Sequence, residues 1–542
     1  MIYKFSSHAI WLTAATCLLA LLSCKHNAKE QTVKRPNILF VIADDQSFPY
    51  SSVYGATGVH TPAFDKVAEN GVLFYNAFAA APQCSPSRAA ILTGKNIWQL
   101  EEAGTHSSYF PKKFPVFTDL LENAGYKTGY TGKAWGPGNW KDAGWTRNPV
   151  GPEYNKKKLV PPTKGISPID YFSNFVDFYE EKNPDEPFFF WYGANEPHRP
   201  YTEGSGQQIG KKLADADMPR FLPDDSTVRS DIEDYAAEIE WFDQQLAKMI
   251  DFLREKGQLE NTLIVVTSDN GMPFPAAKAN LMEYGSHVPL AISWPAKIKG
   301  GRIARDLVSL IDLAPTFLQV AGIKETPVMT GKSMGNILFP DNTSGEQVHR
   351  DYVLTGRERH SDARPDNLGY PSRAIRTEHY LFVLNCKPDR WPAGNPPPPK
   401  EEIAKLDRED PSGNFKSIGT GYNDIDDPSP TKSFMMKHRA EWPELFAQGF
   451  ERRPAEQLFD IEKDPDCITN LANVPAFDSV RTVLNNKLAD LLTKQGDPRM
   501  LGYGDIFESY PRFGLMRNWP GFKERGAYNP AYQNNQPQLK KQ

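Results

Sequence analysis

Two pairs of polar residues follow two apolar runs, and their types suit the binding of a hard cation. The run "PNILFVIADD" ends in Asp44 and Asp45, and the run "NTLIVVTSDN" ends in Asp269 and Asn270. Three carboxylates and one amide oxygen make an all-oxygen ligand set, which favours Ca²⁺ or Mg²⁺, whereas zinc prefers His or Cys. An Asp after a strand is also a common turn residue or helix cap. Two such pairs after two similar runs nevertheless favour a metal site.

A lone cysteine, Cys84, stands in a second segment that could do chemistry, "APQCSPSRAAILTG". It has no nearby partner for a disulfide or a zinc site. The residues after Pro86 predict a short helix that ends at Gly94, with Cys84 at its N-terminus. Free N–H groups and the helix dipole favour an anion there, and Arg88 on the first turn can reach the same anion. The residues alone also allow a reactive thiolate or a buried, inert cysteine.

The elements that must position these residues are strands and helices in alternation. Residues 36–45 and 261–270 are rich in Val and Ile and do not alternate with polar residues, which is typical of parallel strands buried on both faces. Sites in such sheets form beyond the carboxyl ends of the strands. A helical period runs through residues 230–257, where Ser230 can cap the start and Gly257 the end. Shorter combinations of helix and strand are predicted in residues 115–133 and 308–322. We therefore expect an α/β sheet with helices on both faces.

The pattern changes after about residue 350. Short strands and turns are predicted in residues 369–385 and 456–472, with a proline-rich loop at 390–400 between them. This indicates a smaller C-terminal α+β domain. The expected division of the chain is a signal peptide, a tether, a large α/β domain, the α+β domain and a tail that wraps the surface, at residues 1–23, 24–34, 35–355, 356–500 and 501–542.

The first residues predict export. Residues 9–22 are apolar but too few to span a bilayer comfortably, and "LLSC" follows them, ending at Cys24. This ending resembles a bacterial lipobox, in which the chain is cut before the cysteine and that cysteine receives a lipid. The polar run that follows suits a tether and argues against the alternative, a buried N-terminal helix. We expect a bacterial lipoprotein in the periplasm or on the cell surface, attached to the membrane by its lipid alone. An oxidising compartment would allow Cys386 and Cys467 to pair.

Composition limits the remaining function classes. Hydrophobic residues make up 39% and charged residues 24% of the 542 residues, which is typical of a globular protein. The net charge is −5, from acidic and basic residues that are mixed along the chain. Nucleic-acid binding normally needs a basic surplus or patch, so we expect no nucleic-acid partner.

The segment around Cys84 resembles the signature of the type I sulfatases, a branch of the alkaline-phosphatase superfamily. The resemblance lies in C-x-P-S-R followed by "AAILTG", and further segments similar to those of the family follow in order. They are "NILFVIADD", "TGYTGK" with Lys133, "ANEPHRP" with His198, "VVTSDNG", "VSLIDLAPTFLQVAG" and "EQLFDIEKDPDCITNLA". The resemblance covers essentially the whole mature chain. It implies the sulfatase fold, with a large mixed sheet between helices and a smaller C-terminal domain.

The resemblance also implies the chemistry. A sulfatase-maturing enzyme would oxidise Cys84 to formylglycine (3-oxoalanine), whose hydrate carries two hydroxyls on one carbon. One hydroxyl would attack sulfur, and the other, once deprotonated, would expel sulfate. One Ca²⁺ at Asp44, Asp45, Asp269 and Asn270 would neutralise the sulfuryl oxygens, together with Arg88, Lys133 and Lys278. His198 would protonate the leaving group.

One position departs from the family pattern. Many sulfatases carry a histidine two residues after the lysine of "TGYTGK", and this chain has Trp135 there. The base that triggers sulfate release is therefore open, and His106 and His287 are candidates.

Three further stretches resemble the N-sulfoglucosamine sulfohydrolases (sulfamidases, or heparan N-sulfatases). They are "ADDQSFPYSSVYG", "SDNGMPFPAAKANL" with Lys278 and "GRERHSDARPDNLGYPSRAIR". The resemblance implies cleavage of the N-sulfate of a non-reducing-end glucosamine in a sulfated oligosaccharide. Candidate contacts to the sugar are His106, Arg357, Glu358 and His360, although a solvated loop is equally compatible with the last three.

Three alternatives stay open. An O-sulfatase on another polysaccharide would share every feature above. A phosphoesterase of the same superfold would want a Ser or Thr nucleophile and His/Asp ligands for two zinc ions, which the sequence does not offer at these positions. A non-catalytic, glycan-binding lipoprotein would result if Cys84 is never converted.

Overall fold

Eight strands form one large mixed sheet at the centre of the protein, in the order β3-β4-β1-β5-β6-β2-β7, with β8 paired to β2. The computed structural model describes residues 35–323, 329–340, 350–365, 368–399 and 421–513. Strands β1, β3, β4 and β5 are mutually parallel, whereas β6 runs antiparallel to both β5 and β2. The strands are β1 (Asn37–Ala43), β2 (Gly71–Phe78), β3 (Lys127–Gly132), β4 (Phe188–Gly193), β5 (Thr262–Ser268), β6 (His287–Ser293), β7 (Arg302–Ala304) and β8 (Val308–Ser309).

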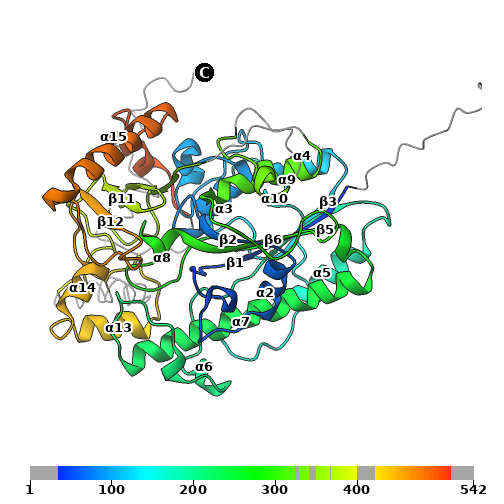
Figure 1. The fold of residues 1–542 in the computed structure, drawn as a ribbon, viewed down its shortest axis with the longest axis horizontal. Coiled ribbons are helices and arrows are strands. Elements are labelled where there is room, and N and C mark those ends of the chain that lie inside the picture. Colours follow the sequence, from blue (N-terminus) through cyan, green and yellow to red (C-terminus); the bar gives the residue numbers. More distant parts are fainter. Residues whose placement is uncertain (1–34, 324–328, 341–349, 366–367, 400–420, 514–542) are drawn as a thin grey trace, which may run out of the picture. The chain divides into compact units, whose positions relative to one another are not determined.

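Helices cover both faces of this sheet, as Figure 1 shows. Alternate side chains of β1 enter two different cores: Phe40 packs on one side with residues of α3, α4 and α9, and Val41 packs on the other with residues of α2, α5 and α7. Every residue of β1 and β5 is buried, which is why their sequences are apolar without alternation. The predicted α/β layers are confirmed. The helices of these layers are α2 (Pro62–Glu69), α3 (Cys84–Thr93), α4 (Phe117–Asn123), α5 (Tyr171–Glu180), α7 (Ser226–Glu255) and α9 (Leu313–Val320), with the short α6 (Ser205–Gln208), α8 (Glu283–Ser286) and α10 (Gly335–Leu338) between them.

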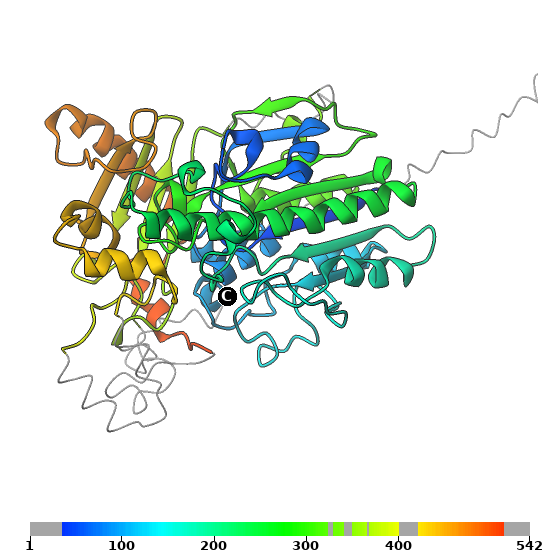
Figure 2. The same ribbon diagram turned by 90° about the horizontal axis from the view of Figure 1, so that it is seen from below.

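The long helix α7 lies along one face of the sheet (Figure 2) and begins earlier than the sequence indicates. Its N-cap is Asp225, whose carboxylate accepts a hydrogen bond from the backbone N–H of Thr227 at 2.8 Å. The predicted cap, Ser230, lies inside the first turns instead. Asp225 is the stronger signal because its carboxylate also complements the positive end of the helix dipole. The predicted end is close, since the last helical residue is Glu255 and Gly257 adopts a positive φ of 64°.

A second, antiparallel sheet of four strands follows in the chain, in the order β12-β11-β10-β9. Its strands are β9 (Val353–Arg357), β10 (Ser372–Arg376), β11 (Tyr380–Asn385) and β12 (Glu456–Asp460), and its helices are α13 (Pro430–Lys437), α14 (Pro443–Phe450) and α15 (Asp478–Lys494). The expected boundary at residues 355 and 356 falls inside β9. From Pro36 onward the described residues form one compact unit, because side chains of the second sheet share a buried core with the large sheet.

The predictions on the cysteine pair and on the two ends of the chain have different outcomes. Cys386 and Cys467 both carry free thiols, so the disulfide that the sequence allowed is not formed. Cys467 is buried among the apolar residues behind β10 and β11. Residues 1–34, with Cys24, and residues 514–542 of the expected tail lie outside the described part of the chain. Within that described part, no helix is both long and apolar enough for a transmembrane span.

The carboxyl group of Glu238, on α7, is buried without a partner among the described residues. The residue is 1% exposed, and neither carboxylate oxygen accepts a hydrogen bond. Burial raises the pKa of Glu238 well above its ordinary value of 4.5, and Glu196 and Asp234 add to this rise. As the pH rises, the Glu238 carboxyl group ionises in the unfolded chain before it ionises in the folded protein. The contribution of Glu238 to stability therefore declines as the pH rises above the pKa of the unfolded chain.

We therefore expect Glu238→Gln to be more stable than the wild type at pH 8, by at least ~1 kcal/mol in the free energy of unfolding. Near pH 4 the two proteins should be equally stable. Denaturant unfolding at both pH values measures this difference. The same difference at pH 4 and pH 8 would show that the carboxyl group is not the cause.

Candidate active site

Four strand ends meet at one edge of the large sheet and bring together residues that are far apart in sequence. β1 and β5 pair in register from Asn37 opposite Thr262 to Ala43 opposite Ser268, so the residues that follow them lie side by side. β4 pairs with β1 in the same direction, and β3 pairs with β4 on its other side. The residues after these ends are Asp44 and Asp45 (β1), Asp269 and Asn270 (β5), Lys133 (β3) and His198 (β4). The predicted meeting of the two polar pairs is confirmed.

The three aspartates at this edge form a buried cluster of oxygen ligands. One oxygen from each of Asp44, Asp45 and Asp269 lies within 4.8 Å of the others, a spacing that suits the ligand shell of a cation bound at 2.3–2.6 Å. Asn270 donates its amide N–H to Asp45 Oδ1 at 2.7 Å. Its own Oδ1 atom is buried without a hydrogen-bond partner among the described residues, as is Asp44 Oδ1. Buried oxygens left without donors are costly, and a hard cation would satisfy them, so these residues fit Ca²⁺.

The electrostatics of the cluster point the same way. Burial raises the pKa of the Asp269 carboxyl to about 6, and although Arg88 opposes this rise, the Asp44 and Asp45 carboxylates add to it. Asp45 itself adopts a positive φ of 77°, which a non-glycine residue tolerates only where its surroundings hold it. Crowded carboxylates and a strained backbone mark this edge as built for a ligand.

Three cationic side chains surround the cluster. Arg88 Nε donates to Asp269 Oδ2 at 2.7 Å, and Lys133 Nζ donates to Asp44 Oδ2 at 2.5 Å. Lys278 Nζ donates to Asp45 Oδ2 at 2.7 Å. Burial alone would lower the pKa of each cation, but the carboxylates outweigh burial and raise all three pKa values. All three groups therefore carry a positive charge at neutral pH and can hold an anion.

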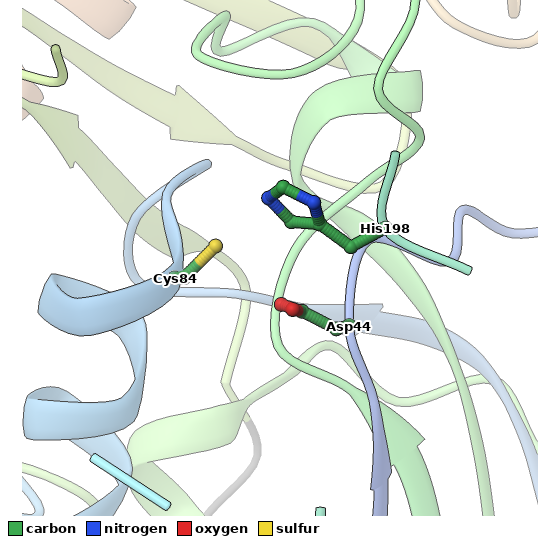
Figure 3. A group of neighbouring side chains, drawn as sticks. All are labelled: Asp44, Cys84 and His198. Carbon is green, nitrogen blue, oxygen red and sulfur yellow. The ribbon is translucent and has the colours of Figure 1, made fainter. Parts of the chain in front are cut away.

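Cys84 is the first residue of α3, and Gly94 ends that helix in the left-handed region, as the sequence predicts. Figure 3 shows the thiol pointing toward Asp44 and His198, each from a different element. One atom from each of the three side chains lies within 4.8 Å of the others. Burial raises the pKa of the Cys84 thiol well above its ordinary value, and Asp44 adds to this rise. A buried, protonated thiol is a poor nucleophile, which argues against a reactive thiolate here.

His198 is held with one ring nitrogen facing the cluster. Its Nδ1 atom lies 2.6 Å from the carbonyl oxygen of Arg199, and a carbonyl can only accept, so Nδ1 carries a proton. Nε2 is then free to accept, and Lys278 Nζ lies 3.0 Å from it. Arg199 is in turn fixed by two hydrogen bonds to Asp231, at 2.8 and 2.6 Å. The ring is 29% exposed and can be reached from outside.

A pocket of about 590 Å³ opens at this edge of the sheet. Sequence reasoning identified Asp44, Lys133 and His198 in its lining but missed most of the rest. The other lining residues include Tyr130, Asn148, Gly165, Ser167 and Asn195. Tyr130 lies on β3 itself, and the others come from loops after β3 and β4. Only the sheet order shows that these loops face each other.

The expected sugar contacts of the C-terminal region have other roles. Arg357 is 1% exposed and donates to Asp424 Oδ2 and to the Pro392 carbonyl. Glu358 is fully buried between Arg373 and Arg499, each at 2.7 Å. The Nδ1 atom of His360, also buried, lies 3.3 Å from Asp424 Oδ1. Each of these three side chains is therefore held by buried charged partners, because the arginines of this stretch need buried carboxylates and pairing draws the whole stretch inward. Their contact with substrate stays a prediction.

The two histidines considered as bases differ sharply. His287 is stacked between Phe48 and Phe78, and its nitrogens face Glu283 and the Tyr75 carbonyl, so it is a structural residue. His106 is half-buried and packs against the ring of His360, with ring centroids 4.7 Å apart. It lies on a loop whose Ser107 N–H donates to Ser85 Oγ. Burial lowers the pKa of His106 well below its ordinary value.

Trp135, at the position where many sulfatases carry a histidine, is buried. Its indole N–H donates to the carbonyl of Ser85 at 3.1 Å, next to Cys84. It therefore fixes the start of α3 and supplies no base.

Sequence reasoning also missed Asp426. Its Oδ2 atom accepts a hydrogen bond from Lys278 Nζ at 2.7 Å and lies 4.0 Å from His198 Nε2. The sequence of the segment "NDIDD" (423–427) is typical of an acidic turn. Nothing in its spacing predicts that Asp426 contacts Lys278 and His198, which lie much earlier in the chain.

Known proteins that are similar to this chain are sulfatases and related sulfohydrolases. The family model "Sulfatase" matches residues 36–323, and the model "N-sulphoglucosamine sulphohydrolase, C-terminal" matches residues 277–387. An ulvan-active sulfatase of Formosa agariphila is 25% identical over 93% of this chain and 84% of its own length. The human N-sulphoglucosamine sulphohydrolase is 27% identical over 87% of this chain and 93% of its own length.

Solved structures share the fold. One, a complex with its substrate D-glucosamine-2-N,6-O-disulfate, has a TM-score of 0.59 at 20% identity and covers 86% of this chain and 99% of its own. Another, a 2-O glycosaminoglycan sulfatase, has a TM-score of 0.58 at 17% identity over 90% and 99% of the two chains. The family model "Sulfatase" matches more than half of the residues of this chain, and the strand-end cluster lies within that match. The chain therefore belongs to the sulfatase family of sulfuric ester hydrolases.

Proposed function

We propose that this enzyme removes sulfate from a sulfated sugar of the glycosaminoglycan type, and that its substrate is the N-sulfate of a non-reducing-end glucosamine. The observation that carries the proposal is the grouping of Cys84, His198 and the aspartate cluster within reach of the cations of Arg88, Lys133 and Lys278. Support for the substrate comes from the human relative, the second matched model and the disulfated glucosamine named as the substrate in one solved structure. A pocket of about 590 Å³ is of a size that holds one sugar, which favours a chain end.

Cys84 is proposed to be converted to formylglycine by a sulfatase-maturing enzyme. The hydrate of that group would supply the nucleophile that the buried thiol does not. α3 presents residue 84 at its first position, where backbone N–H groups face an incoming anion. Arg88 and Lys133 would bind the sulfuryl oxygens, and the positive charge of Lys278 would help them to neutralise the charge that shifts to those oxygens.

Asp44, Asp45, Asp269 and Asn270 are proposed to hold one Ca²⁺, which would supply further positive charge to the sulfuryl group. The three side-chain cations already offset the three aspartates, so an added divalent ion would leave the site positive toward an anion. His198 would act as the acid when its Nε2 atom is protonated and no longer accepts from Lys278, and it would give that proton to the leaving nitrogen. His106 is the histidine retained as a candidate base for sulfate release.

The test is the release of inorganic sulfate from a panel of N-, 2-O-, 3-O- and 6-O-sulfated saccharides, as monosaccharides and as longer chains. We expect cleavage of glucosamine N-sulfate at a non-reducing end and none within a chain. Cleavage of an O-sulfated sugar alone would refute the substrate and leave the enzyme class intact. That outcome is the second candidate, an O-sulfatase, which the ulvan-active relatives and an N-acetylglucosamine-6-O-sulfatase of Bacteroides thetaiotaomicron favour.

Calcium is expected to stabilise the protein through the aspartate cluster. At a free concentration of one hundred times its dissociation constant, Ca²⁺ should add about 2.7 kcal/mol to the free energy of unfolding. Asp269→Asn removes one charged ligand but keeps an acceptor for Arg88, so this variant should fold and lose most of the gain. Calorimetric titration of Ca²⁺ into protein from which metal has been removed with a chelator measures binding. Denaturant unfolding with and without Ca²⁺ measures the gain in the free energy of unfolding.

A matched control is Asp312→Asn, which alters a comparable aspartate–arginine pair with Arg350. It should keep the full gain from Ca²⁺. Stoichiometric zinc in the purified protein, or an undiminished gain in Asp269→Asn, would contradict calcium at this site.

We also propose that the chain is an exported bacterial lipoprotein with its lipid on Cys24, in the periplasm or on the cell surface. The support is the apolar run and "LLSC" that precede the polar tether. Mass spectrometry of the mature N-terminus tests it, because an unmodified N-terminus at another residue would refute the lipid.

A further inference from the structure

The ammonium group of Lys278 is enclosed by three acceptors that come from three regions of the chain. Asp45 Oδ2 and Asp426 Oδ2 each lie 2.7 Å from Nζ, and His198 Nε2 lies 3.0 Å from it. An ammonium group has three N–H donors, so the three acceptors use all of them and fix its orientation. Lys278 is 3% exposed, and water can do little to replace a missing acceptor.

A buried network holds Asp426 in place. Two positions earlier, Asp424 accepts hydrogen bonds from Arg357 and Ser361 and pairs with Arg364 at 2.6 Å. One position later, Asp427 pairs with Lys432 at 2.8 Å. These anchors explain why Arg357 is buried: with Asp424 it fixes the segment that carries Asp426 toward the large sheet.

We propose that Asp426 is a positioning residue of the sulfatase centre, brought from the C-terminal region to hold the Lys278 ammonium against His198 Nε2. It lies beyond both matched family models, which end at residues 323 and 387. The inference rests on the proposed roles of Lys278 and His198 in the reaction.

The charge of Asp426 makes this role testable. A carboxylate near a site for sulfate repels the substrate anion, so binding alone would improve without it. Its benefit must then lie in turnover, through the geometry of Lys278 and His198. Removal of the charge should lower kcat and at the same time raise the affinity for sulfate. A loss of structure would instead lower both kcat and the affinity for sulfate.

The experiment compares Asp426→Asn with the wild type and with two further variants. We expect kcat on glucosamine N-sulfate to fall about tenfold to hundredfold, the range seen when a residue that orients a reacting group is removed. Cleavage of nitrophenyl sulfate, whose leaving group needs no proton, should change less than about threefold. Asp426→Glu restores the carboxylate and should recover part of the loss. Asp460→Asn alters a comparable aspartate–lysine pair with Lys463, outside the site, and should leave both activities unchanged.

A binding measurement separates this inference from the proposed function. Inorganic sulfate is titrated into each protein, and we expect Asp426→Asn to bind it a few-fold more tightly than the wild type. Parallel losses on both substrates, weaker sulfate binding, or no rescue by Asp426→Glu would overturn the positioning role. If the wild type cleaves neither substrate, the proposed function fails, and the sulfate titration still decides the role of Asp426.

Discussion

Replacing Cys84 with alanine is expected to abolish turnover while the fold and the binding of sulfate survive. Alanine keeps the helical start of α3 and removes only the atom that would become the nucleophile. Loss of a covalent nucleophile typically costs several orders of magnitude, so kcat should fall by more than ~10³-fold. Assays of sulfate release and thermal unfolding, run on the same preparation, measure the two halves of this expectation.

Serine at position 84 makes the test more specific. In a host that cannot convert serine, Cys84→Ser should be as inactive as the alanine variant, although its hydroxyl is the right size to attack. Cys386→Ser, at a free thiol outside the site, should keep full activity. Full activity in Cys84→Ser made in that host would sink the formylglycine mechanism.

Replacing His198 with alanine should separate substrates by their leaving groups. An amide ion is a far poorer leaving group than a phenolate, so cleavage of an N–S bond needs a proton at nitrogen. His198 Nε2 is the ring atom that faces the site, because Nδ1 is committed to the Arg199 carbonyl. A positioned acid contributes about 10²–10⁴-fold, and we expect a loss of about 10³-fold on glucosamine N-sulfate.

Nitrophenyl sulfate should be cleaved by the same variant almost as well as by the wild type. His60→Ala, at an exposed histidine, serves as the control and should match the wild type on both substrates. Equal losses on the two substrates in His198→Ala would mean that His198 acts in some other way than as the acid for the leaving group.

The sequence alone could predict those parts of the site that follow strand ends. Asp44, Asp269 and Lys133 come directly after parallel strands, and His198 follows β4 after a short turn. Parallel strands of one sheet place such residues at one edge. The helix from Cys84 to Gly94 was predictable for a local reason, since a glycine with positive φ ends it. Local rules and a common strand direction are enough for these residues.

Pairings across long distances could not be predicted in the same way. The arginine- and histidine-rich stretch after residue 356 suggested a polar surface for a sugar, yet its side chains are buried against charged partners about 65 to 140 residues further along the chain. Arg357 and His360 pair with Asp424, and Glu358 pairs with Arg499. Asp426 reaches Lys278 across 148 positions. The sequence shows that a charged residue will need a partner if it is buried. Which residue becomes that partner depends on how the second sheet packs.

The chemical state of residue 84 in the active protein tests most directly whether this chain works as a formylglycine sulfatase. Protein made with a sulfatase-maturing enzyme is digested, and the peptide that contains "CSPSR" is weighed and treated with a hydrazide reagent. We predict a peptide lighter than the cysteine form, labelled by the hydrazide, in a proportion that rises with specific activity. A fully active preparation in which residue 84 is unmodified cysteine would contradict the mechanism proposed here.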